Sequence, residues 1–154
     1  MKFSDLLTPS SVRVLSSTTS KKRLMHELSE LAQGAHSLPA PDVLHALLER
    51  ESLGPTGVGQ GVALPHARLP GLQEVVGIFV LLEKPIDFDS VDRQPVDVVF
   101  ALFAPEDAGV EHLKALALVS RTLREPSICA KLRANRDSDT LHTILTEAEA
   151  ERAA

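Results

Sequence analysis

The sequence predicts an α/β (α+β) fold: a single-domain, three-layer α/β/α sandwich with a mixed β-sheet. Two nearly continuous apolar runs, at 75–82 and 96–104, have the pattern of strands that are covered on both faces. Helical patterns lie before and after these runs, so helices should flank the sheet on both sides. The chain has 154 residues without a repeat or a low-complexity segment, and we expect one domain over 1–154.

The first part of the chain should form one strand and two helices. The segment 12–15, Val-Arg-Val-Leu, is typical of a short strand. Ser20 can cap a helix that closes at Gly34 and carries the apolar stripe Leu24, Leu28, Leu31 and Ala35. A second helix should begin around Pro41 and end before Gly54, with one apolar face made of Val43, Leu44, Leu47 and Leu48.

A glycine-spaced turn follows at 57–61 and leads into a short apolar strand. Pro65 cannot donate a hydrogen bond to a sheet, so this strand should end there or lie on an edge. His66 is therefore expected at the exposed end of a strand, a poor position for packing and a good one for chemistry. From periodicity alone, a backbone hydrogen bond explains this histidine as well as a chemical role does.

Helices should dominate the last part of the chain. A long helix after Gly109 carries Leu116, Val119 and Leu123 on one stripe, and Pro126 should start a shorter helix with Ile128, Cys129 and Leu132. A final helix over 140–148 should bury Leu141, Ile144, Leu145 and Ala148. The tail at about 149–154 has nothing to bury and is expected to fray.

Composition excludes several classes of protein. The net charge is −5, aromatic residues make up 3% of the chain, and Trp and Tyr are missing, so nucleic acid is not an expected partner. The lone cysteine, Cys129, cannot form an internal disulfide, and the start of the chain has no signal-peptide pattern. No apolar run is long enough to span a bilayer, so we expect a cytoplasmic protein that does not insert into a membrane.

Neither a cofactor nor a metal ion is expected. The glycine turn at 57–61 lacks the third glycine of a dinucleotide fingerprint and the Gly-Lys-Ser/Thr of a nucleotide-binding loop. The histidines do not pair with cysteines or carboxylates at the spacing of metal ligands.

Helical periodicity separates the remaining histidines. His26, His45 and His142 fall on polar faces and should be solvated, and His36, in a predicted loop, has no evident role. His112 shares a face with the apolar stripe of its helix and should point inward at the helix N-terminus. Such a group is more often a core or capping histidine than a catalytic one, although the first turn of a helix suits an anion.

Arg50 leans toward the buried stripe of the second helix, because it lies seven residues after Val43 and three after Leu47. The alternative to a chemical role is a local ion pair with Glu49 or Glu51.

These residues together resemble the enzyme IIA components of the bacterial phosphotransferase system, in the mannitol, fructose and nitrogen-regulatory group. The resemblance covers nearly the whole chain. It is carried by Glu49-Arg50-Glu51, by the segment from Gly59 to His66, by the segment from Asp92 to Leu102 and by His112-Leu113. The pattern from Pro126 to Leu145 is similar to the nitrogen-regulatory branch.

The resemblance implies a phosphoryl carrier without a cofactor. The histidine after the proline corresponds to His66, which would accept the group as tele-phosphohistidine from a phosphorylated HPr-like carrier. The other two positions imply that Arg50 neutralises the phosphate charge and that His112 hydrogen-bonds the phosphate or orients His66. An exposed apolar rim of Val62 and Leu64 is expected to dock the donor.

Three functions stay open. The first is phosphorylation-dependent control of partner proteins in nitrogen and potassium regulation, which the resemblance implies. The second is a sugar-specific, fructose- or mannitol-type IIA component that passes phosphate to a IIB domain during uptake. The third is a binding module that keeps the fold and takes no phosphate.

Overall fold

A mixed sheet forms the middle layer of the computed structural model, which describes residues 1–153, with side chains for 1–148. The strands are β1 (Val12–Leu15), β2 (Gly57–Gly59), β3 (Val62–Ala63), β4 (His66–Leu69), β5 (Val76–Ile86) and β6 (Val96–Pro105). The helices are α1 (Phe3–Leu6), α2 (Lys21–His36), α3 (Ala40–Ser52), α4 (Gly109–Leu123), α5 (Pro126–Arg133) and α6 (Ser138–Ala153), with a 3-10 turn, η1, at Pro9–Ser11.

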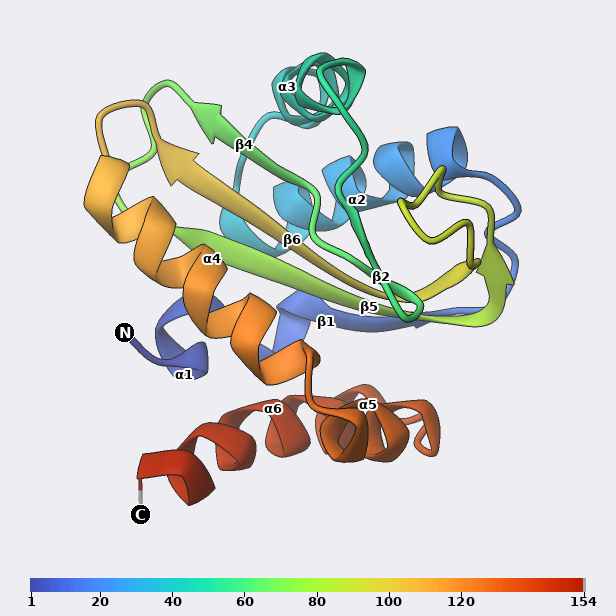
Figure 1. Ribbon diagram of the computed structural model, residues 1–154. Helices are drawn as coiled ribbons and strands as arrows, with labels where there is room; N and C mark the ends of the chain where they lie inside the picture. The colour runs from blue at the N-terminus through green and yellow to red at the C-terminus, as the bar shows by residue number, and fades with distance from the viewer. Residues whose placement is uncertain (154) are drawn as a thin grey trace.

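The two long strands lie at the centre of the sheet. β5 and β6 are antiparallel, with Phe79 opposite Phe100. β1 adds to β5 in parallel, β3 and β4 both add to β6 in parallel, and β2 closes the edge antiparallel to β3. The helices α2 and α3 cover one face, and α1, α4, α5 and α6 cover the other (Figure 1). The predicted three-layer sandwich with a mixed sheet is confirmed.

Alternate side chains of β6 enter two separate apolar cores. Val98, Phe100 and Leu102 pack with α1, α4, α5 and α6, whereas Val99, Ala101 and Phe103 pack with α2 and α3. Because successive side chains of a strand point to opposite faces, a strand buried on both sides must be apolar throughout. This explains the continuous apolar runs in the sequence.

The strand at 12–15 and the cap of α2 are confirmed, since the Ser20 hydroxyl accepts a hydrogen bond from the Arg23 amide at 3.1 Å. The predicted end of that helix at Gly34 is wrong. α2 continues to His36, and Ser37 ends it in the left-handed conformation with φ 57°. One glycine costs a helix only about 1 kcal/mol, and His36 Nε2 anchors the last turn through a 2.9 Å hydrogen bond to the Gly77 carbonyl. His36 therefore has a structural partner.

The predicted position of His66 needs a correction. The strand before Pro65 does end, but the chain re-enters the sheet at once, and His66 is the first residue of β4. Pro65 lacks an N–H group, yet its carbonyl accepts a hydrogen bond from the Leu102 amide at 2.9 Å. His66 is then paired with Leu102 in register. It lies at the beginning of a strand, held by the central strand β6.

The last three helices agree with the sequence analysis over 109–148, where the predicted apolar positions are buried or partly buried. The predicted fraying at 149–154 concerns residues outside the part whose side chains are described, so it stays a prediction. Of the three histidines expected at the surface, His45 is exposed and lies 3.3 Å from Glu49, whereas His26 and His142 are half-buried. No helix within 1–153 is long and apolar enough to cross a membrane.

Candidate functional site

Three side chains from three different elements meet in one hollow. His66 begins β4, Arg50 lies in the last turn of α3, and His112 lies in the first turn of α4. Arg50 Nε stands 3.3 Å from His66 Nε2, and the two imidazole rings have centroids 5.5 Å apart at an angle of 70°. All three line a hollow of about 680 Å³ between α3 and α4. The fold thus brings together the three residues that the sequence singled out.

Both ring nitrogens of His66 have assigned partners. Nδ1 lies 2.9 Å from the Leu64 carbonyl, which can only accept a hydrogen bond, so Nδ1 carries the proton. Nε2 accepts from the Arg50 guanidinium and therefore keeps its lone pair. The ring is half-buried, and its Nε2 faces the Arg50 guanidinium in the hollow. This is the tautomer that a nucleophilic Nε2 requires.

The surroundings keep His66 neutral. Burial is the main cause that lowers its pKa, and the Arg50 charge lowers it further. The hydrogen bond to the Leu64 carbonyl and the charge of Glu51 act in the opposite direction. Since the pKa lies below its usual 6.5, the ring is predominantly unprotonated at neutral pH.

Arg50 is held by the loop after its own helix. Its Nη1 donates to the Gly54 carbonyl at 3.1 Å. The glutamates that could have paired with it have other partners: Glu49 lies beside His45, and Glu51 bonds Lys21. The local ion pair considered as an alternative is therefore not formed among the described residues, and the guanidinium faces His66.

His112 is buried, with 6% of its surface exposed, and its Nε2 has no hydrogen-bond partner among the described residues. Burial, then the charges of His66 and Arg68, lower its pKa to about 4. A buried polar atom without a partner is costly, so this nitrogen lacks a hydrogen bond that a buried imidazole usually makes.

The pKa of His112 makes stability depend on pH. Between about pH 6.5 and pH 4, His112 is protonated in the unfolded chain but neutral in the folded protein, where its pKa is about 4. The free energy of unfolding is therefore highest above pH 6.5 as far as His112 is concerned. This residue should lower it by about 2 kcal/mol as the pH falls from 8 to 5. Urea unfolding at both values should show that His112→Gln removes this part of the acid loss. An equal loss in the variant would contradict the assignment.

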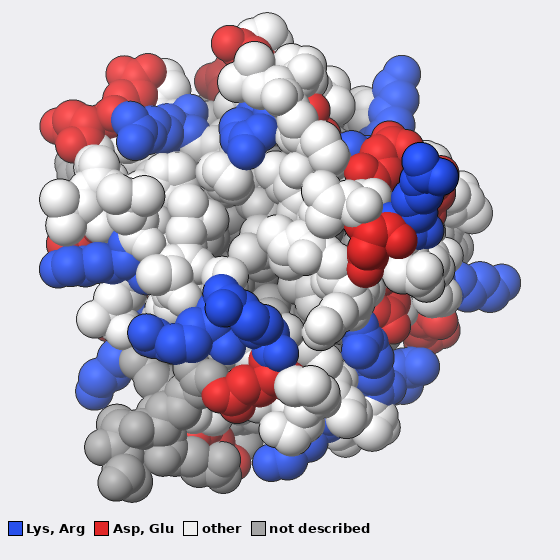
Figure 2. Space-filling view, viewed as in Figure 1, with Lys and Arg blue, Asp and Glu red and all other residues white. Residues whose placement is uncertain are grey.

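The apolar surface beside His66 differs from the expected one. Val62 and Leu64 are 3% and 5% exposed, because they pack into the core, so they cannot form a rim. The hollow is instead bordered by Leu53, which is 81% exposed, and by Leu113, which is 67% exposed. We call these two residues the apolar rim. Figure 2 shows that the surface between α3 and α4 is largely uncharged, with separate basic and acidic groups at its edges.

Arg68 also lines the hollow, and the sequence analysis missed it. Its Nη1 contacts the Glu106 carbonyl at 3.4 Å. Side chains two residues apart in a strand lie on the same side, so the spacing from His66 to Arg68 was a usable signal. The signal could not be read because β4 was not expected.

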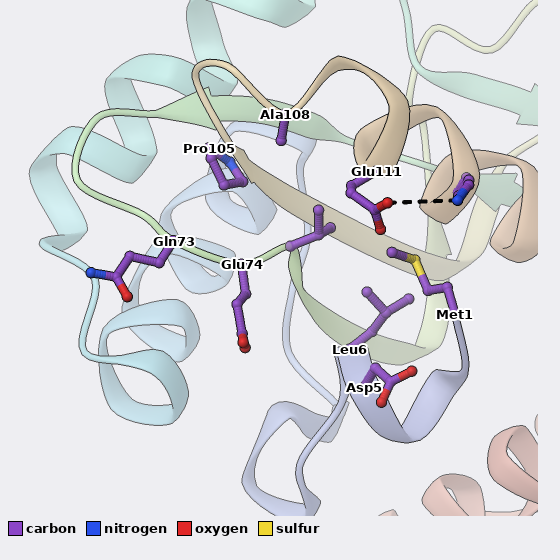
Figure 3. A pocket seen from close by; sticks show the side chains of 10 residues that line it. Met1, Asp5, Leu6, Gln73, Glu74, Pro105, Ala108 and Glu111 are labelled. Carbon is purple, nitrogen blue, oxygen red and sulfur yellow. Dashed lines mark ion pairs between the residues drawn. The ribbon is translucent and has the colours of Figure 1, made fainter.

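A second hollow of about 600 Å³ lies between α1 and the start of α4 (Figure 3). Its lining includes Asp5, Glu74 and Glu111, and Glu111 pairs with Lys114 at 3.6 Å. None of the three site residues lines it, and its acidic groups disfavour an anion. Among residues 1–148, no three histidine, cysteine, aspartate or glutamate side chains form a group that could hold a metal ion.

Comparison with known proteins identifies the family. The sequence model described as "Phosphoenolpyruvate-dependent sugar phosphotransferase system, EIIA 2" matches residues 5–148. The chain belongs to this EIIA family. The resemblance found in the sequence is confirmed, and membership of the family supports a role in the phosphotransferase system in general.

Relatives within the EIIA family cover most of this chain. A nitrogen regulatory protein from Bradyrhizobium diazoefficiens is 46% identical over 145 residues, which are 94% of this chain and 95% of that protein. The crystal structure of nitrogen regulatory protein IIA-Ntr from Neisseria meningitidis is 37% identical, with a TM-score of 0.84 over 94% of this chain and 98% of that one. IIA mannitol from Escherichia coli, at 18% identity and a TM-score of 0.76 over 90% of this chain and 98% of that one, shares the fold.

Proposed function

We propose that this EIIA protein is a phosphoryl-accepting regulator of the nitrogen phosphotransferase system. His66 takes a phosphoryl group on Nε2 from a phosphorylated HPr-like carrier, and the phosphorylation state controls which proteins bind in nitrogen and potassium regulation. The observation that carries this proposal is the lone pair of His66 Nε2 beside the Arg50 guanidinium at 3.3 Å. The names of the relatives at 46% and 37% identity support the regulatory branch.

The transfer needs no change of proton on His66. The Nε2 lone pair attacks phosphorus, the Nε2–P bond forms, and the P–N bond of the donor breaks, with its electron pair returning to the donor ring nitrogen. The Nδ1 proton stays on the hydrogen bond to the Leu64 carbonyl. Arg50 neutralises charge on the phosphoryl oxygens, and the buried His112 Nε2–H donates to one of them.

The product differs from the free protein mainly in charge. Because Nδ1 keeps its proton, the phosphoryl oxygens carry about two negative charges and the ring about one positive charge, so the transfer lowers the net charge by about one, on a chain whose formal net charge is −5. These charges are added in a hollow that an apolar rim borders, so a partner bound over the rim meets either a neutral imidazole or a phosphate. This difference is large enough to select between partners.

Intact mass after incubation with the phosphorylated carrier tests the proposal. One phosphoryl group should be added to the wild-type protein, and acid should remove it again, as expected for phosphohistidine. An unchanged mass would favour the binding module. Adding IIB proteins of fructose and mannitol systems to the labelled protein separates the remaining alternative, because a sugar-specific IIA component would pass the label on and the proposed regulator would keep it.

The apolar rim should dock the donor. We expect Leu113→Glu to raise the KM for the phosphorylated carrier about tenfold and to leave kcat nearly unchanged, because it places a charge in a contact that must exclude water. Val91→Glu is the matched control, since Val91 is 74% exposed but lies between β5 and β6, outside the hollow. Equal KM values for the two variants would contradict this docking surface.

A further inference from the structure

Glu51 is a nearly buried carboxylate directly after Arg50, and it does not line the hollow. Its side chain is 8% exposed. Oε1 accepts from Lys21 Nζ at 2.8 Å and from the Thr56 amide at 2.8 Å, and Oε2 accepts from the Thr56 hydroxyl at 2.7 Å. Both carboxylate oxygens are thus bound, and the group ties the end of α3 to the chain just before β2.

A first chain of hydrogen bonds leads from Glu51 to the nucleophile. The Thr56 carbonyl accepts from the Leu64 amide at 2.9 Å. The Leu64 carbonyl in turn accepts from His66 Nδ1 at 2.9 Å. Glu51 therefore holds Thr56, and Thr56 holds the main chain of Leu64. The Leu64 carbonyl in turn fixes the tautomer of His66.

A second route leads from Glu51 to the guanidinium. The Glu51 carbonyl accepts from the Gly54 amide at 3.2 Å, and the Gly54 carbonyl accepts from Arg50 Nη1 at 3.1 Å. The side chain of Glu51 fixes the other end of the same loop at Thr56. Glu51 therefore bonds both ends of the loop at 53–56, which holds Arg50 toward His66.

Lys21 prevents Glu51 from competing for Arg50. Its ammonium group lies over the Phe88 ring, 4.6 Å from the centroid, and 3.8 Å from Asp89. Lys21 thus pairs with the Glu51 carboxylate without itself lining the hollow. A carboxylate next to Arg50 in sequence would otherwise be its nearest ion-pair partner.

We propose that Glu51 is a positioning residue that holds the His66 ring and the Arg50 guanidinium in the geometry for phosphoryl transfer. The proposal rests on the proposed function, because it concerns the same site. Glu51 touches neither the phosphoryl group nor the donor. It acts through Thr56 and the loop at 53–56, so its loss should reduce the rate of the chemical step and spare donor binding.

The chain offers a matched control for this residue. Glu27 on α2 accepts from the Thr18 hydroxyl at 2.6 Å and from Arg23 Nε at 2.9 Å, the same kinds of partner that Glu51 has. It does not line the hollow. Glu51→Ala and Thr56→Val should lower kcat for phosphoryl transfer about tenfold or more with little change in KM, whereas Glu27→Ala should change neither constant. Glu51→Gln keeps an oxygen for the Thr56 amide and should recover most of the rate.

A second readout does not depend on transfer. Nitrogen-15 NMR of the unphosphorylated protein should show only the Nδ1–H tautomer of His66 in the wild type and in Glu27→Ala, and a mixture in Thr56→Val and Glu51→Ala. In the labelled variants, part of the phosphoryl group should move to Nδ1. The role of Glu51 would be overturned if Thr56→Val and Glu51→Ala kept the tautomer, the kcat and the labelling position of the wild-type protein. If the wild type takes no phosphoryl group, the proposed function fails, and the tautomer spectra still test Glu51.

Discussion

His66→Ala should take up no phosphoryl group from a phosphorylated HPr-like carrier. The reason is chemical, because the hollow between α3 and α4 contains two histidines and only one has an Nε2 that meets a cation. His112 is buried, and in the proposed arrangement its Nε2 carries a proton that it donates to a phosphoryl oxygen, so this nitrogen has no lone pair with which to attack phosphorus. The other described histidines lie outside this hollow. Removing the His66 ring therefore removes the acceptor, and labelling measured by intact mass or by gel autoradiography should fall to background.

The control for this variant is His45→Ala. His45 is exposed on α3, beside Glu49, and its loss changes a surface pair of small energetic value. This variant should label at the wild-type rate. Normal labelling of His66→Ala would overturn the site, and so would loss of labelling in a His45→Ala variant that keeps the wild-type fold and thermal stability.

The second large effect is expected from Arg50→Ala. The guanidinium lies 3.3 Å from the attacking nitrogen and is the cation best placed to meet the phosphoryl oxygens. Losing one such charged donor costs about 3 to 4 kcal/mol of transition-state stabilisation, so kcat should fall by about 10² to 10³-fold. Arg50→Lys should recover part of the rate, since a lysine supplies the charge without the planar pair of donors.

The same variant should change the pH dependence of labelling. The Arg50 charge lowers the pKa of His66, so Arg50→Ala raises that pKa toward its usual value. The neutral ring is the nucleophile, and the rate falls as pH drops through this pKa. The acidic limb of the pH–rate profile should therefore move to higher pH in Arg50→Ala. A limb that stays in place, together with an unchanged kcat, would show that Arg50 does not act on His66.

The architecture could be predicted because its two long strands are buried on both faces and therefore continuously apolar in sequence. Helices with clear stripes, such as α4, were predictable for the same reason of burial. The short elements were not. α1 has four residues and η1 has three, too few for a periodic pattern. β4 was missed because Pro65 suggested an end to the strand, whereas its carbonyl keeps the chain bonded to β6.

The site could be predicted in part. His112 was identified by its position on the buried stripe of its helix. Arg50 was identified because it lies close to the buried stripe of a different helix. Their distance from His66 could not be predicted, because it depends on how α3 and α4 pack on opposite sides of the sheet edge. The apolar rim was misplaced for a related reason. Val62 and Leu64 are apolar and close to His66 in sequence, yet both are buried in the core under α4.

The pairing of His66 with Leu102 has a consequence for how information can leave this molecule. His66, the residue proposed to gain the charge, is paired through its main chain with β6, the strand whose side chains enter both cores. Since β6 is buried on both faces, we expect a group added to the His66 ring to change the hollow and to leave the helices of the opposite layer in place. A receptor protein that distinguishes the two states is therefore expected to bind over the imidazole, whereas a protein that binds on α5 and α6 should have the same affinity for both states.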